Sequence, residues 1–292
     1  MAPLVDYTSS PSPSPPPTPH EPPPPTLPPL PPSFHDLYAS TVRTAPSDSP
    51  SLHQGRVRTT PHLPGRWPSH LYLEWHPPTP VHSDLAALVS ALRTALLPAG
   101  VELHSFLTSD LGAPLPLHVS LSRSLSLTTG EKDGFLREVV DAVSGGTGTG
   151  TGTVELEGDG VEWHRTEESG RSFLVLRVRE VGRPAAGGNP NPVLTGLLRR
   201  CNAVAEGHGQ PGLYEWAFGE GEEAVGRAFH VSVAWSFAEP TGEVRRVTEE
   251  VFGGARGTEV RIGVDGVKVK IGNVVTHVPL RARGGGRGLL GL

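Results

Sequence analysis

Cysteine is almost absent from this sequence, since Cys201 is the only one among 292 residues. A single thiol excludes an internal disulfide, so we expect a protein of a reducing compartment, either the cytosol or the nucleus. The sequence also lacks an apolar run long enough to cross a membrane, and its first residues lack the apolar core of a secretory signal. These absences predict a protein without a membrane partner.

An excess of positive charge is also missing, because the formal net charge is −5. Proteins that coat duplex nucleic acid are normally basic, so this balance argues against broad, nonspecific duplex binding. It leaves room for a short local contact with the end of a strand. No dense cluster of lysine and arginine marks a nuclear import signal, so composition alone does not choose between cytosol and nucleus.

Proline, in contrast, is abundant and unevenly distributed: 17 of the 32 prolines lie in the first 50 residues. Because proline removes backbone donors and favours extended polyproline II, residues 1–50 are expected to form a disordered tail. This tail is either an inert spacer or a ligand for a proline-reading partner. The glycine-rich residues 282–292 predict a second flexible tail. One folded domain of two lobes is then expected at residues 51–281.

The periodicity of the remaining sequence predicts mixed strands and helices. Strands are expected at 69–76, 101–107, 116–127, 171–181 and 229–237, and helices at 82–100, 129–146, 191–209 and 240–254. Ser83 and Thr129 are the expected N-caps of the first two helices. A short hairpin is expected around residues 158–160, and residues 259–280 are expected to form two or three hairpin strands that turn at "VDGV" (264–267). Without a glycine-rich phosphate loop, this mixture predicts an α+β fold, with two pseudo-symmetric lobes of antiparallel sheet and flanking helices around a central cleft.

Two of these strands share a pattern that suggests chemistry. In "LHVSL" (117–121) and "FHVSV" (229–233), apolar residues alternate with histidine and serine. The alternation puts His118 and Ser120 on one face of the first strand, and His230 and Ser232 on one face of the second. Residues i and i+2 are about 6.5–7 Å apart along a strand, so an imidazole and a hydroxyl of one strand can contact the same phosphate.

Two such pairs facing each other would suit the cleavage of RNA. One histidine removes the proton of a 2′-hydroxyl, which attacks the neighbouring phosphorus, and the other protonates the departing 5′-oxygen. Two serine hydroxyls hold the non-bridging oxygens, and the product is a 2′,3′-cyclic phosphate. The unperturbed pKa of histidine, about 6.5, allows both roles near neutral pH. This chemistry requires neither a metal nor another cofactor.

The same residues also allow simpler interpretations. His118 and His230 could be partly buried sheet histidines whose ring nitrogens are satisfied by neighbours. A serine hydrolase is disfavoured because the sequence contains no G-x-S-x-G motif. A zinc site is disfavoured because Cys201 is the only thiol and the remaining histidines do not form a ligand array. The histidines of "SHLYLEWH" (69–76) are expected to be surface or packing residues.

The paired strands and their surroundings resemble the U6 snRNA phosphodiesterase family of the two-histidine (2H) phosphoesterase superfamily. The resemblance rests on "GRVRTTPHLPGRWPSHLYL" (55–73), "LHVSLSRS" (117–124), "RSFLVLRV" (171–178) and "FHVSVAWS" (229–236), which cover about residues 55–280 in the family's order. Members of this family trim the 3′ oligouridine tail of the spliceosomal U6 RNA. The resemblance therefore implies a nuclear 3′-to-5′ exoribonuclease with U6 RNA as its partner, for which we expect a monomer.

Individual roles follow from the resemblance. It implies that His118 and His230 are the catalytic base and acid, with His118 favoured as the base, and that Ser120 and Ser232 bind phosphate. An aromatic residue before the second histidine strand is expected to stack on the terminal base, with Tyr214 as the candidate and Trp216 and Phe218 as rivals. The backbone around Arg227, Phe229 and Val231 is expected to shape the nucleotide pocket. Candidate contacts to the RNA backbone are Arg56, Arg58 and Arg66.

Two rival functions use the same residues. One is the hydrolysis of a 2′,3′-cyclic phosphate on an RNA end or a small nucleotide. The other is a noncatalytic RNA-binding module, against which the presence of both histidines and both serines speaks. The sequence also leaves open whether the cyclic product is opened further to a linear phosphate.

Overall fold

The computed structural model describes residues 63–109, 111–145, 152–166, 169–183, 187–254 and 260–280. The expected tails, 1–50 and 282–292, lie outside these ranges, as do Arg56 and Arg58. Among the helices of the described ranges, none combines the length and the apolar character that a membrane crossing requires.

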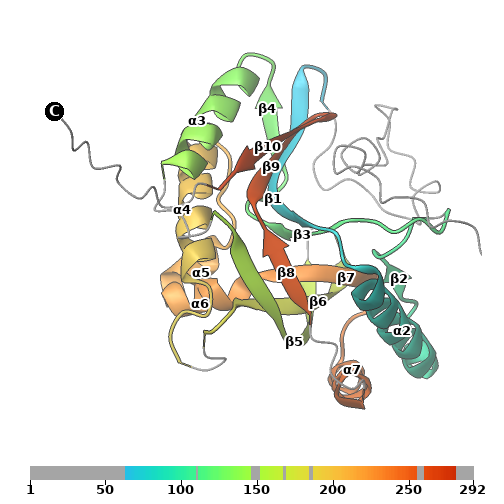
Figure 1. The fold of residues 1–292 in the computed structure, drawn as a ribbon. Helices are drawn as coiled ribbons and strands as arrows, with labels where there is room; N and C mark the ends of the chain where they lie inside the picture. Colours follow the sequence, from blue (N-terminus) through green and yellow to red (C-terminus); the bar gives the residue numbers. More distant parts are fainter. Residues whose placement is uncertain are drawn as a thin grey trace, which may run out of the picture. The chain divides into compact units, whose positions relative to one another are not determined.

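A single antiparallel sheet organises the described residues (Figure 1). Its strand order is β10-β9-β1-β3-β7-β6-β5-β8, while β2 pairs with β7 and β4 pairs with β1. The strands are β1 (Arg66–Trp75), β2 (His104–Ser105), β3 (Leu117–Ser120), β4 (Leu125–Thr128), β5 (Val154–Thr166), β6 (Arg171–Glu180), β7 (His230–Ser236), β8 (Arg261–Val264), β9 (Gly266–Ile271) and β10 (Val274–Pro279). The two halves of the chain meet where β3 pairs with β7, and the predicted α+β class is confirmed.

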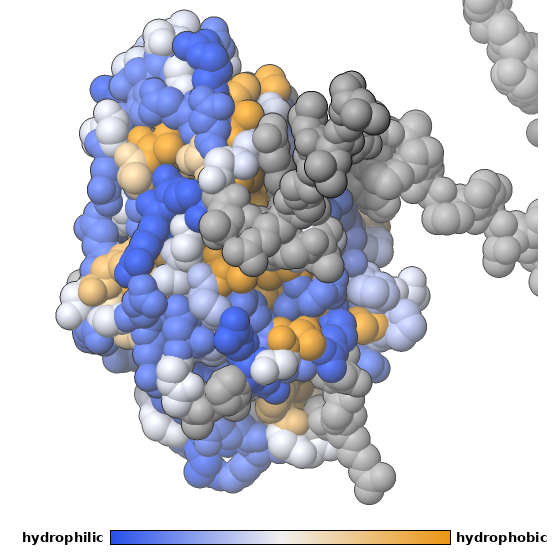
Figure 2. Space-filling model, turned by 60° about the vertical axis from the view of Figure 1, so that its left-hand side comes forward, coloured by the Kyte–Doolittle hydropathy of each residue, from blue (hydrophilic) through white to orange (hydrophobic). Residues whose placement is uncertain are grey.

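The helices pack mainly as three pairs, α3 with α4, α2 with α7, and α5 with α6 (Figure 1). Their bounds are α2 (Thr79–Leu96), η2 (Leu97–Ala99), α3 (Lys132–Ser144), α4 (Pro192–Gly207), α5 (Glu215–Glu220), α6 (Glu222–Ala228) and α7 (Gly242–Gly254). The face of the molecule seen in Figure 2 is mostly hydrophilic, with hydrophobic residues in separate small patches. The longer helices each bury apolar side chains, such as Leu92 of α2, Phe135 of α3 and Leu198 of α4.

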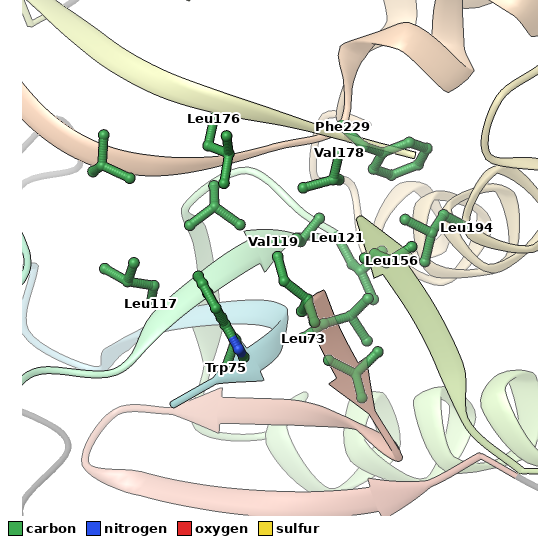
Figure 3. Packing of buried hydrophobic residues seen from close by; sticks show 14 of the residues in the cluster. Leu73, Trp75, Leu117, Val119, Leu121, Leu156, Leu176, Val178, Leu194 and Phe229 are labelled. Atoms are coloured by element: carbon green, nitrogen blue, oxygen red, sulfur yellow. The ribbon is translucent and has the colours of Figure 1, made fainter. Parts of the chain in front are cut away.

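The core lies against one face of the central strands (Figure 3). Leu73 of β1, Val119 of β3 and Val231 of β7 are at most 1% exposed and point into it. The sheet curls around these side chains, so that β1 and β8 come into contact although they are not neighbours in the strand order. Because side chains alternate along a strand, the residues between these apolar positions lie on the opposite face.

Two helices begin elsewhere than expected. Helix α2 starts at Thr79 and not at Ser83, because Pro80 suits the first turn, where its missing N–H costs no hydrogen bond. Helix α3 starts at Lys132, so Thr129 is not its N-cap. The Thr129 hydroxyl instead accepts a hydrogen bond of 3.0 Å from the indole nitrogen of Trp67.

The strand predictions also need four corrections. The segment 116–127 is two strands, β3 and β4, which pair with different parts of β1. Residues 158–160 form a bulge within the continuous strand β5, where Gly160 has φ +93°, and not a hairpin. The turn at Asp265 joins no hairpin either, because β8 pairs with β5 whereas β9 pairs with β1 and β10. The expected strand at 101–107 shrinks to the two residues of β2.

Candidate active site

The two His-x-Ser segments lie on adjacent strands at the centre of the sheet. Val119 of β3 is paired with Val231 of β7 in antiparallel register. Continuing this register by one residue in each direction places Ser120 opposite His230 and His118 opposite Ser232. The valines face the core, so all four polar residues lie together on the other face. The two histidines are then diagonal neighbours, which are expected about 7–8 Å apart, with their Cβ atoms somewhat closer.

His230 is held in one orientation by its own loop. Its Nδ1 donates a hydrogen bond of 2.8 Å to the carbonyl of Ala228, and Tyr214 Oη lies 3.4 Å from the same nitrogen. Because Nδ1 carries the proton in this contact, the lone pair of the neutral imidazole is on Nε2. The ring is therefore oriented to exchange a proton through Nε2.

Tyr214 reaches His230 through an unusual backbone conformation. Its φ is 58°, and among the described residues it is the only non-glycine with a positive value. A left-handed conformation is uncommon for a bulky residue, and such strain tends to occur where function requires it. The ring of Tyr214 also packs edge-on against Phe229, with centroids 5.8 Å apart. Tyr214 thus forms one wall beside His230.

His164 of β5 covers His230 from another side. The two imidazoles are stacked, with centroids 5.1 Å apart and planes 16° from parallel. His164 Nε2 lies 3.8 Å from Glu162 Oε2, and the same carboxylate oxygen lies 3.8 Å from Nε of Arg177. Arg177 is the cross-strand neighbour of His230 on β6. His230 therefore lies among other titratable side chains, namely those of His164, Glu162 and Arg177, and is not an isolated histidine of the sheet.

His118 of β3 is surrounded in a similar way by side chains of the neighbouring strand β1. Its cross-strand neighbour there is Glu74, and Ser120 is opposite Tyr72. The His118 ring meets His70 and Tyr72 edge-on, with centroids 5.4 Å apart in both cases. Although these two rings shield part of the imidazole from water, His118 keeps an exposed surface that a substrate can reach.

The surroundings of both histidines disfavour their charged forms. Loss of hydration is the main cause that lowers the pKa of His230, to about 4, and the neighbouring His164 lowers it further. Loss of hydration also lowers the pKa of His118, although the carboxylate of Glu74 acts in the opposite direction. His118, its diagonal neighbour, lowers the pKa of His230 as well. Both rings are therefore neutral at pH 7 in the free protein.

The lowered pKa values of His118 and His230 predict an acidic optimum for kcat/KM. The reaction needs one neutral and one protonated histidine, so kcat/KM should follow the species that carries one proton on the pair. Both pKa values are lowered below 6.5, so protonated histidine is lost as the pH rises through them. We expect a bell-shaped profile with its maximum below pH 6.5 and a roughly tenfold fall per unit above it. A flat profile between pH 6 and 8 would contradict these pKa shifts.

The serine hydroxyls complete the cluster. Ser120 and Ser232 are half-buried, and no described residue makes a hydrogen bond with either hydroxyl. Both hydroxyls are therefore free to donate to an added group. Together with two neutral imidazoles, this arrangement can hold a phosphodiester and move protons on two sides of it.

The other residues singled out in the sequence lie around this cluster in different ways. Phe229 and Val231 are buried in the core, so only their backbone groups can face a nucleotide. Arg227 is exposed on α6 and pairs with Glu223 at 2.6 Å. Trp216 is 63% exposed, and the contacts of His230 come from Tyr214 instead.

Two further aromatic and basic candidates are engaged elsewhere. Phe218 carries the guanidinium of Arg199 over its ring at 5.5 Å. Arg66 donates a hydrogen bond of 3.1 Å to the carbonyl of Ser126, at the far end of β1 from Glu74. Neither residue contacts the two histidines.

Sequence reasoning missed the contribution of β1. His70, Tyr72 and Glu74 alternate with Leu71, Leu73 and Trp75, in the same pattern as the two histidine strands. The structure brings these three polar residues to the face that carries His118, where His70 and Tyr72 stack at 5.2 Å. The alternation of "SHLYLEWH" is a signal that could have indicated this, whereas the role of His164 depends on the curvature of β5 and leaves no local signal.

Metal ligands and a thiol are two other kinds of group that support catalysis. No cluster of three or more histidine, cysteine, aspartate or glutamate side chains there has a geometry that could hold a metal ion. Cys201 is buried on α4, and burial raises the pKa of its thiol to about 12, so it is a core residue and not a nucleophile.

Comparison with known proteins places the chain in a family. Residues 28–279 match the family model HVSL, which is described as an uncharacterised conserved protein. The sequence is 42% identical to U6 snRNA phosphodiesterase 1 of Neurospora crassa, over 89% of this chain and 76% of the relative. The chain belongs to the U6 snRNA phosphodiesterase 1 family. The human U6 snRNA phosphodiesterase 1 is 24% identical over 96% of this chain and 99% of its own length.

A solved structure supports the same fold. The chain is similar to Kluyveromyces marxianus Usb1 with uridine monophosphate, with a TM-score of 0.54, 14% identity, and coverage of 73% of this chain and 98% of that one. The family resemblance drawn from the two histidine strands and their flanks is therefore confirmed. Membership in this family makes the chain an RNA phosphodiesterase.

Proposed function

We propose that this protein is a metal-independent 3′-to-5′ exoribonuclease that trims the 3′ oligouridine tail of U6 snRNA. The observation that carries this proposal is the antiparallel pairing of two His-x-Ser strands on one polar face. It occurs in a chain 42% identical to a protein named U6 snRNA phosphodiesterase 1. The proposal places the action of the protein in the nucleus, on the 3′ end of a single strand, and as a monomer. It leaves the proline-rich residues 1–50 as the segment that could engage a protein partner.

The reaction needs only groups that the site and the RNA supply. The 2′-hydroxyl of the penultimate nucleotide gives its proton to one imidazole, and its oxygen forms a bond with the adjacent phosphorus. The bond from phosphorus to the 5′-oxygen of the terminal nucleotide breaks, and the other imidazole protonates this oxygen. The hydroxyls of Ser120 and Ser232 donate to the non-bridging oxygens, whose charge grows in the transition state. The products are the terminal nucleoside and a shortened RNA with a 2′,3′-cyclic phosphate.

The neighbourhood of each histidine suggests which is the acid. Tyr214 lies beside His230 and is the aromatic side chain available to stack on the terminal base. The terminal nucleotide is the leaving group, so the histidine on its side protonates the departing 5′-oxygen. His230 is then the acid and His118 the base, which takes the proton of the penultimate 2′-hydroxyl.

A comparison of two RNA ends tests this function. Purified protein with excess EDTA is incubated with a 5′-labelled oligouridylate that ends in a normal ribose, and with one that ends in a 2′,3′-cyclic phosphate. Stepwise shortening of the first substrate on a gel is the expected result. Opening of the cyclic end without shortening of the first substrate would replace the proposal by a cyclic phosphodiesterase. Binding without conversion of either would replace it by a noncatalytic RNA-binding module.

A further inference from the structure

Strand β9 carries two lysines that face the candidate site. The chain has three lysines in all, and two of them, Lys268 and Lys270, lie on this strand. Lys270 is opposite His70 and Lys268 opposite Tyr72, so both lie on the face that carries His118 and Ser120. Two of the three lysines therefore face the candidate site, in a chain whose other basic residues are almost all arginine.

The two lysines differ in their partners. Lys268 Nζ lies 3.5 Å from Glu74 Oε2, which neutralises much of its charge. Lys270 is half-buried, and no described residue forms an ion pair or a hydrogen bond with its ammonium group. Burial lowers the pKa of this ammonium, and its charge in turn lowers the pKa of both His70 and His118.

A half-buried cation without a partner is unfavourable for a fold that could have used a neutral residue. An anion that enters the site would recover this loss, because the attraction is stronger where water is partly excluded. The ammonium is a compact charge with three N–H donors, which suits the two non-bridging oxygens of one phosphate. Lys270 is opposite His70, whose ring lies 5.4 Å from that of the proposed base His118, and this position makes an RNA phosphate the matching anion.

The order of the strands indicates which phosphate this is. β1 lies between β3 and β9, so β9 is about 9–10 Å from β3 across the sheet, and Lys270 is opposite His70, four residues along β1 from the residue that pairs with His118. This separation favours a phosphate next to the scissile one. The terminal nucleotide lies on the Tyr214 side in the proposed mechanism, so the upstream RNA leaves over His118 toward β1 and β9.

We propose that Lys270 binds the backbone phosphate one nucleotide upstream of the scissile phosphate. This inference rests on the proposed function, because it uses the direction of the RNA across the two histidines. Lys270 thereby sets the register of the RNA and holds the penultimate 2′-hydroxyl beside His118. The subsite recognises charge and not a base.

The test compares two oligouridylates that differ in one charge. One has normal linkages, and the other has an uncharged methylphosphonate at the linkage immediately upstream of the scissile phosphate. For the unmodified protein we expect kcat/KM to fall roughly tenfold or more with the neutral linkage, because a hydrogen bond to a charged group is lost. Lys270→Gln should lower kcat/KM for the normal substrate by a similar factor and leave the neutral substrate almost unchanged.

Two variants provide controls. Lys270→Arg retains the charge and should restore most of the discrimination between the two substrates. Lys132→Gln removes the third lysine, which lies on α3 over the ring of Trp67 at 3.9 Å, and should discriminate as the unmodified protein does. Binding of 2′-deoxy versions, which cannot be cleaved, is measured in parallel, so that the Lys270 comparison does not depend on turnover.

The outcomes separate the subsite from the function. Equal losses with both substrates in Lys270→Gln, or no loss with either, would overturn the upstream subsite. If the unmodified protein cleaves neither substrate, the proposed function fails. The binding of the 2′-deoxy oligonucleotides then decides for or against Lys270 by the same pattern of discrimination.

Discussion

Replacing His118 or His230 with alanine is expected to lower kcat for oligouridylate trimming by a factor of about 10² to 10⁴. General acid and base catalysis contribute about this much each, and no described neighbour can substitute in the same geometry. His70 and His164 lie on other strands than His118 and His230, so neither takes the place of a lost imidazole on β3 or β7. Burial also lowers the pKa of His70 to about 3. The measurement is single-turnover cleavage of a labelled oligouridylate by each purified variant.

The fold should tolerate both replacements. His118 is exposed, and the loss of the bond from His230 to the carbonyl of Ala228 removes about 1 kcal/mol of stability. The thermal transition should therefore stay within a few degrees of that of the unmodified protein. His277→Ala, which removes an exposed histidine on β10, serves as the control and should trim normally. Trimming at the normal rate by either site variant would show that the histidine concerned is not catalytic.

Replacing Tyr214 with alanine is expected to raise KM for oligouridylates by about 10- to 100-fold with a smaller effect on kcat. Stacking of a base on an aromatic side chain contributes about 1–3 kcal/mol and acts mainly on binding. Tyr214→Phe keeps the ring but removes the hydroxyl that lies 3.4 Å from His230 Nδ1. This variant should keep a KM close to normal, so that any change in its kcat reports on the hydroxyl alone.

Trp216→Ala is the matched control for the stacking assignment. Trp216 is two residues away and 63% exposed, and it makes no described ring contact with His230. Its KM should be unchanged. A raised KM in Trp216→Ala together with a normal KM in Tyr214→Ala would move the stacking role from Tyr214 to Trp216.

The central features of the site could be predicted from the sequence because they depend on local periodicity. Alternation alone places His118 and Ser120 on one face, and His230 and Ser232 on one face, whatever the register of the sheet. The pairing of Val119 with Val231 then brings the two faces together. This pairing is a long-range contact between residues more than a hundred positions apart, and no local pattern specifies it.

The errors also have physical reasons. The sequence around Gly158 and Gly160 contains the residues of a tight turn, but the long partner strand β6 keeps β5 extended and absorbs the extra residues as a bulge. Ser83 has the chemistry of an N-cap, but Pro80 allows α2 to start earlier. The contributions of His164 and Lys270 depend on how the sheet curls and on which strands become neighbours, which is settled by tertiary packing.

The most direct test of the account is whether trimming requires the penultimate 2′-hydroxyl. Purified protein with excess EDTA is given two 5′-labelled oligouridylates, one all-ribose and one with a single 2′-deoxy group at the penultimate nucleotide. The account predicts stepwise shortening of the first and no removal of the terminal nucleotide from the second, because the attacking oxygen is missing. Equal shortening of both substrates would mean that water or another external nucleophile attacks the phosphorus, and would contradict the proposed roles of His118 and His230.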